Sequence, residues 1–184
     1  MKLNSVTPWT GRIVRKFHRH IPISLLVEPE PYGIPLYWRV DDVDQALVEI
    51  GIHRHAGSFV SLTLVTLQKA PAELTQPPPS LEPGTPFVLP AFNLDLWPRR
   101  HEARTRYDYY DVVGPFELAL ATDQARLQLL PEPILSWIWT DNCLAFGLTE
   151  AQELGCVWLL DLSEREQELL RSGLAIPQPT RQSS

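Results

Sequence analysis

The sequence has no long apolar run. Its apolar stretches are short, as in Val157-Trp158-Leu159-Leu160, whereas a membrane-spanning helix needs roughly 20 such residues. The first residues are not followed by the apolar region of a secretory signal, so we expect none. These absences predict a cytoplasmic protein without a membrane partner.

Cysteine is scarce, with Cys143 and Cys156 alone in 184 residues. Both lie among apolar neighbours, which predicts two buried free thiols. Two cysteines 13 positions apart could also form a disulfide or a reactive pair, and this alternative stays open.

The common catalytic motifs are missing. The sequence contains neither a phosphate-cradling G-x-x-x-x-G-K nor a dinucleotide-binding G-x-G-x-x-G pattern. Gly57-Ser58-Phe59 lacks the second glycine of a serine nucleophile elbow. Cys143 could pair with a distant histidine, but its apolar neighbours predict burial, which silences a thiol. We expect no cofactor and no catalytic residue.

Positive charge is in deficit, with a formal net charge of −6 that weighs against nucleic-acid binding. The deficit is uneven, because residues 1–106 carry a net +2 and residues 107–184 a net −8. The acidic part could complement the basic part within the fold or serve a basic partner, and a solvated mixed surface is the simpler interpretation.

Proline is abundant, with 18 residues against 9 glycines, which argues against a helical bundle. The fold we expect is α+β, a mainly antiparallel sheet built from hairpins with a C-terminal helix; the alternative is all-β. Residues 70–90 form a proline-rich segment, which predicts an exposed loop or a spacer. Residues 1–176 would then be one domain, or two subdomains at 1–69 and 91–176, and 177–184 a disordered tail.

Two hairpins are predicted. The first joins residues 46–53 to 58–67 through a connection that contains Gly57, and the second joins 116–121 to 125–130. For the first arm, a short helix over residues 43–50 is the alternative. Further strands are expected at residues 12–18, 23–28, 36–40, 92–97, 134–140, 143–146 and 157–160.

One helix has a clear start. Ser163 and Glu166 fit a capping box, Leu169 and Leu170 supply an apolar side, and Gly173 follows the predicted end.

A further helical turn is predicted over residues 149–155. On the strand before it, Trp137 and Trp139 would share one face, as core residues or as part of an interface.

Four of the five histidines form two His-Arg-His triplets. In a strand, His18 with His20 and His53 with His55 would each project to one face, and two such pairs could converge on a metal. The second triplet falls at the predicted hairpin turn, so surface histidines and no metal site are expected. The acidic residues within 41–44 are interpreted as a solvated turn.

Arginine and tyrosine gather in one short stretch, residues 104–111. Both residue types are enriched at protein–protein hot spots, and a half-buried strand is the alternative. The stretch follows a basic knot that could steer an acidic partner. The candidate interface residues are Arg104, Arg106, Tyr107, Tyr109 and Tyr110.

These observations predict a non-catalytic intracellular protein that binds another protein. Small acidic bacterial immunity proteins, which neutralise basic toxins, share its size and charge. The alternative function is a metal-assisted hydrolase that uses the His-Arg-His pairs. The partner's identity and any homo-oligomer stay open.

Overall fold

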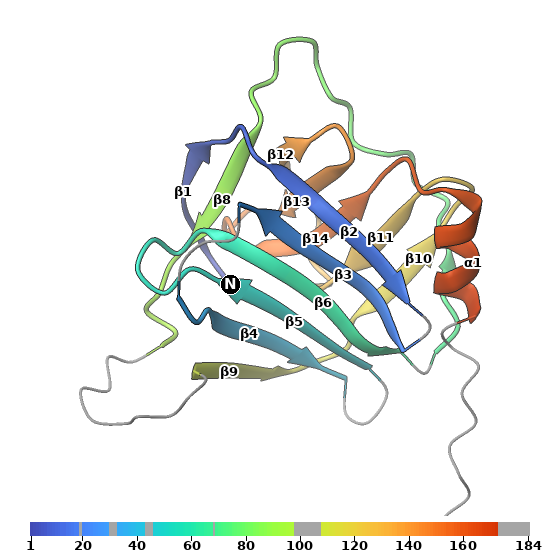
Figure 1. Cartoon of the computed structure of the whole chain (residues 1–184), viewed down its shortest axis with the longest axis horizontal. Coiled ribbons are helices and arrows are strands. Elements are labelled where there is room, and N and C mark those ends of the chain that lie inside the picture. The colour runs from blue at the N-terminus through green and yellow to red at the C-terminus, as the bar shows by residue number, and fades with distance from the viewer. Residues whose placement is uncertain (19, 30–32, 43–45, 68, 98–107, 173–184) are drawn as a thin grey trace, which may run out of the picture.

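The computed structural model describes residues 1–18, 20–29, 33–42, 46–67, 69–97 and 108–172. Within these residues the chain forms strands and one C-terminal helix (Figure 1), which confirms the predicted α+β, mainly antiparallel fold. None of the helices in this part of the chain is long and apolar enough to cross a membrane. The predicted tail at residues 177–184 lies outside the described residues.

The first six-stranded sheet, sheet one, has the order β2-β3-β6-β5-β4-β9. Its neighbours are antiparallel except for β4 and β9, which run parallel. Its strands are β2 (Arg12–His18), β3 (Ile21–Glu28), β4 (Leu36–Asp41), β5 (Ala46–Ile52), β6 (Phe59–Leu67) and β9 (Asp108–Val113).

The second six-stranded sheet, sheet two, has the order β12-β13-β14-β11-β10-β7, and its one parallel pair is β10 with β7. Its strands are β7 (Ala72–Glu73), β10 (Glu117–Leu120), β11 (Ala125–Gln128), β12 (Ser136–Asp141), β13 (Leu144–Leu148) and β14 (Leu154–Leu159). A separate antiparallel ribbon joins β1 (Leu3–Pro8) to β8 (Val88–Phe92).

The two sheets share one hydrophobic core, which takes residues from both. Phe59 of sheet one and Phe146 of sheet two meet edge to face, with ring centroids 4.9 Å apart. The core forms because alternate residues of each strand are apolar and point to one face. In β6, Val60, Leu62 and Leu64 are buried and Ser61 and Thr63 lie on the other face, as predicted.

The first predicted hairpin is confirmed as β5 and β6, and the helical alternative for its first arm is wrong over the described residues Ala46–Ile52. The strand period prevails because Val48, Ile50 and Ile52 are all fully buried on one side. Gly57 adopts φ 71° in the connection, where a Cβ would meet the Phe92 carbonyl oxygen at 2.3 Å. The second hairpin is confirmed as β10 and β11.

Much of the proline-rich segment is an exposed connection without strand or helix, as predicted, but parts of it pack on the fold. It contributes β7 to sheet two and β8 to the ribbon. Between them, its apolar side chains pack on the outer face of sheet two, over Trp139 and Trp158. These side chains, which a count of prolines overlooks, are Leu74, Leu81 and Phe87.

The C-terminal helix α1 (Glu164–Ser172) begins with the predicted capping box. Glu166 N–H donates to Ser163 Oγ at 3.3 Å, and Ser163 N–H donates back to Glu166 Oε2 at 2.8 Å. The helix packs against β2 and β3 (Figure 1), and Leu170 is fully buried in the core.

Two local predictions are wrong. Residues 149–155 form a turn, with Gln152 at φ 59°, and β14 already begins at Leu154. The strand predicted at 92–97 ends at Phe92, after which the backbone turns. In both places, the pattern of apolar residues over a few positions was too short to determine the secondary structure.

Candidate protein-binding surface

The predicted interface segment is described only in part. Arg104, Arg106 and Tyr107 lie outside the described residues, whereas Tyr109 and Tyr110 lie in β9. Tyr109 is 41% exposed on the outer face of sheet one. Tyr110 points to the other face, where it packs against the core and contacts Trp97 at 6.1 Å between ring centroids. The two tyrosines therefore have different roles.

The parallel register of β4 and β9 places Tyr37 beside Tyr109 and Arg39 beside Asp111. The two tyrosine rings stack with centroids 5.4 Å apart and planes inclined by 25°. Arg39 Nε donates a hydrogen bond of 2.6 Å to Asp111 Oδ1, and its Cζ lies 4.1 Å from the Tyr109 ring centroid. The guanidinium is thus held by a carboxylate and an aromatic face at once.

The Arg39–Asp111 ion pair shifts the pKa of both residues in the direction that favours their charged forms. The hydrogen bond from Arg39 lowers the pKa of Asp111, and the same hydrogen bond raises the pKa of Arg39. Since the Asp111 side chain is 56% exposed, solvent screens the pair, which adds little to the free energy of folding. Its effect is to fix the orientation of Arg39.

Glu49 occupies the next strand, β5, opposite Arg39 on one side and Thr63 of β6 on the other. It is half-buried, and burial raises its pKa while Arg39 acts in the opposite direction. Within the described part of the chain its carboxylate accepts no hydrogen bond, because the Arg39 side chain is directed at Asp111. Glu49 is a carboxylate with a nearby positive charge but no donor.

Gly51, the next outward-facing position after Glu49 on β5, leaves room for the side chains of its neighbours. A Cβ there would meet Ser61 Oγ at 2.4 Å and would lie 3.5 Å from the Tyr37 ring. The glycine thus lets Tyr37 lie across the sheet. We call the five residues of this region the β4–β9 surface: Tyr37, Arg39, Glu49, Tyr109 and Asp111.

Sequence reasoning missed Tyr37, Arg39 and Glu49. The Arg39–Asp111 pair spans 72 positions, and a parallel pair between distant strands leaves no local pattern. The usable signal is weak: Tyr37 and Arg39 alternate with the buried Leu36, Trp38 and Val40, which places them on the outer face.

The two histidine pairs lie at opposite ends of sheet one. His18 faces Ile21 at the β2–β3 connection. The register of Ile23 with Leu64 puts the β5–β6 connection, with His53 and His55, roughly 20 Å away along the strands. In the described ranges, no three histidine, cysteine, aspartate or glutamate side chains are grouped so that they could hold a metal ion.

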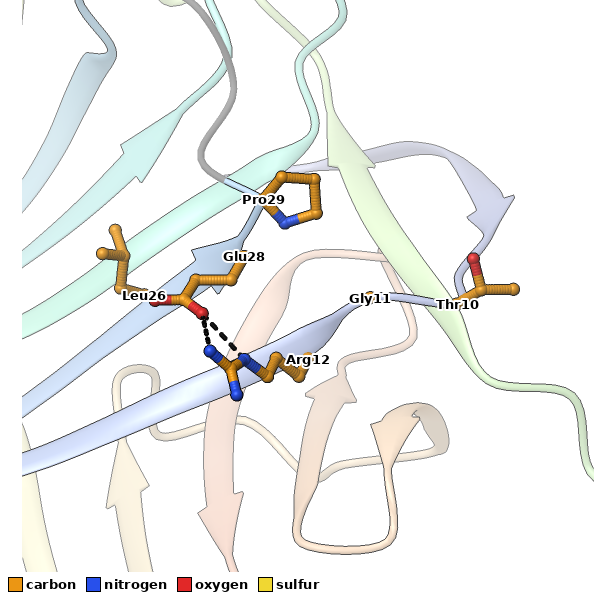
Figure 2. A pocket seen from close by; sticks show the side chains of 6 residues that line it. All are labelled: Thr10, Gly11, Arg12, Leu26, Glu28 and Pro29. Carbon is orange, nitrogen blue, oxygen red and sulfur yellow. Dashed lines mark hydrogen bonds and ion pairs between the residues drawn. The ribbon is translucent and has the colours of Figure 1, made fainter.

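Two shallow hollows on the described part of the chain are lined by neither histidine nor cysteine. The first, of about 570 Å³, lies where β2 begins and β3 ends (Figure 2). There Arg12 Nε donates to Glu28 Oε2 at 2.7 Å, so its two charged groups satisfy each other. The second, of about 510 Å³, is bordered by Glu132, Glu150 and Glu153.

The remaining candidates lie outside the β4–β9 surface. Cys143 and Cys156 are free thiols, as predicted, but only Cys156 is buried; Cys143 is partly exposed, so its predicted burial is wrong. Burial, and for Cys143 a hydrogen bond to Asp161, raises the pKa of Cys143 to about 11, and burial raises that of Cys156 to about 12. Trp137 and Trp139 share the outer face of sheet two, where the proline-rich segment covers the cluster.

The acidic residues at 41–44 are described at two positions. Asp42 pairs with Lys69 at 2.9 Å, Asp41 is exposed, and Asp44 lies outside the described residues.

Comparison with known proteins does not assign the chain to a family. No protein-family model matches it, and a search of curated proteins finds no match either. The functional argument therefore depends on the residues themselves.

Proposed function

We propose that this protein is a non-catalytic cytoplasmic protein that binds another protein through the β4–β9 surface. The observation that carries the proposal is the fixed position of Arg39 between the Tyr109 ring and Asp111. Tyrosine and arginine are the residue types that dominate binding hot spots. A side chain already held in one conformation loses less entropy when a partner binds.

An immunity-type role in bacteria is the form of this function that we favour. The net charge of −6 suits a partner of opposite charge, such as a basic toxin. The exposure of Tyr109 at 41% and Val113 at 71% beside the charged pair supports contact with a protein, because an apolar rim adds buried area.

The test begins with the partner itself. The protein would be cross-linked in its native host, the partner identified by mass spectrometry, and the complex rebuilt from purified components. We expect Tyr109→Ala to weaken binding about 30-fold or more, which corresponds to about 2 kcal/mol. Leu135→Ala is the matched control, since Leu135 is 64% exposed on the segment that leads into sheet two. Equal affinities of the two variants, or the absence of any protein partner, would contradict the proposal.

A further inference from the structure

The β4–β9 surface has more negative than positive groups. In the row formed by Glu49, Arg39 and Asp111 across β5, β4 and β9, one guanidinium stands between two carboxylates. Only Asp111 receives a hydrogen bond from it. Asp41 continues the outer side of β4 and is exposed. Glu49 and Asp111 against Arg39 leave the β4–β9 surface with one net negative charge, and Asp41 at its border adds a second.

Glu49 is the carboxylate of this row that lacks a hydrogen-bond donor in the described part of the chain. It is half-buried among strands and lacks a donor among the described residues, although charged groups in such places are usually paired. Satisfying it within the chain would need a lysine or arginine at a neighbouring outer position. The described neighbours across β6 are Thr63 and Ser61, whose side chains carry no charge.

We propose that the β4–β9 surface receives a basic protein segment, with a lysine or arginine of the partner bound to Glu49 beside the Tyr37 ring. This inference rests on the proposed function and names the chemistry of the partner. Tyr37 pairs with Gly51, the next position after Glu49 on the outer face of β5, and its ring lies over that glycine. The Arg39–Tyr109 contact shows that a guanidinium fits a tyrosine face on this same surface. A cation placed there would gain a carboxylate and an aromatic neighbour at once.

The unpaired carboxylate has a second consequence in the free protein. Because burial disfavours its charged form, Glu49 lowers the stability of the folded state at neutral pH. Glu49→Gln removes that charge while it keeps the shape of the side chain. We therefore expect this variant to melt at the same temperature as the wild type or higher. If Glu49 were needed for the fold, the variant would melt at a lower temperature.

The test uses two short synthetic peptides that have the same shape and differ only in the charge of the side chain at each arginine position. In one, arginine alternates with valine and threonine; in the other, citrulline, which has the shape of arginine without its charge, replaces every arginine. Each is titrated into the ¹⁵N-labelled full-length protein to about 1 mM. We expect the arginine peptide to shift the amides of Tyr37, Glu49 and Tyr109, and the citrulline peptide to leave them unchanged.

The variant Glu49→Gln should lower the affinity for the arginine peptide about tenfold or more. Glu132→Gln, which removes the same charge from an exposed residue outside the surface, should leave the affinity within a factor of two of the wild type.

Three results would overturn the inference: no shift up to the highest concentration, shifts confined to α1 or sheet two, or equal losses in Glu49→Gln and Glu132→Gln. Such results leave the proposed function to be decided by the Tyr109→Ala measurement with the native partner. If Tyr109→Ala weakens binding of the native partner and Glu49→Gln does not, the cation at Glu49 is rejected, while binding through the β4–β9 surface is retained.

Discussion

Arg39 and Asp111 join through a hydrogen bond of 2.6 Å although 72 positions separate them in the sequence. The pair links β4 to β9, the strand that follows the basic stretch of residues 99–106. Because β9 is the last strand on its side of sheet one among the described residues, this pair helps to place Tyr109 on the outer face. An exposed ion pair of this kind does more for orientation than for stability.

The two tyrosines of β9 should separate binding from folding. Tyr109→Ala removes an exposed ring and should change the free energy of unfolding by less than about 1 kcal/mol. Tyr110→Ala removes a ring that packs against the core and should cost about 2 kcal/mol or more. Chemical denaturation of both variants measures the difference. The reverse order would show that Tyr109 is the core residue, and the binding surface would then be misplaced.

In the proline-rich segment, substitution of a packed apolar residue should lower stability, whereas substitution of an exposed proline should not. Phe87→Ala removes a ring from the cluster over Trp139 and Trp158 and should cost about 2 kcal/mol, or about 4–8 °C in Tm. Pro78 is exposed, and Pro78→Ala should change stability by no more than about 0.5 kcal/mol. A red shift of tryptophan fluorescence in Phe87→Ala would report the uncovered rings. Equal melting temperatures for both variants would mean that the segment does not pack as structure.

The prediction of an exposed loop holds for much of the proline-rich segment, but it missed the packed side chains because it considered prolines alone. Prolines at positions 77 and 78 are indeed exposed, but Leu74, Leu81 and Phe87 are spaced irregularly and give no period. What they cover, the tryptophan face of sheet two, is assembled from β12 and β14, which lie about 50 to 85 positions further along the chain. Hairpins and the Ser163 capping box could be predicted because their partners are close in sequence.

The same distinction applies to the candidate site. Side chains alternate along a strand, which explains why the neighbours Tyr109 and Tyr110 face opposite ways. This alternation cannot predict that Arg39 and Glu49 lie beside them, because the register of a parallel pair depends on how the whole sheet closes.

Both thiols should be unreactive in the native protein. A pKa of about 11 for Cys143 and about 12 for Cys156 leaves almost no thiolate at pH 8, so a thiol reagent such as DTNB should react slowly. In denaturant, two thiols per chain should titrate. Fast reaction of a native thiol, or fewer than two thiols in denaturant, would contradict the assignment of two free and inert cysteines.

The same shifts make stability depend on alkaline pH. An unfolded cysteine loses its proton near pH 9, whereas the folded pKa values are higher, so the folded state binds more protons above pH 9. This contribution to stability is complete below about pH 9 and is lost as the pH rises through the folded values. The double variant Cys143→Ser, Cys156→Ala should show a smaller loss of Tm between pH 8 and pH 10.5 than the wild type. Parallel curves would contradict the assigned shifts.

The purified protein should contain no stoichiometric transition metal. The histidine pairs lie at opposite ends of sheet one, so neither pair can complete the ligand set of the other. Elemental analysis by mass spectrometry measures this directly. One equivalent of zinc per chain that disappears in His53→Ala would instead favour the metal-assisted hydrolase.

Hydroxyl-radical footprinting of the rebuilt complex is the most direct test of binding through the β4–β9 surface, because it reports the exposure of individual side chains. If the partner covers this surface, oxidation of Tyr37 and Tyr109 should fall several-fold on complex formation while Leu135, which is 64% exposed, stays as reactive as in the free protein. Unchanged oxidation of both tyrosines, with protection of Leu135 or of α1 in their place, would contradict it.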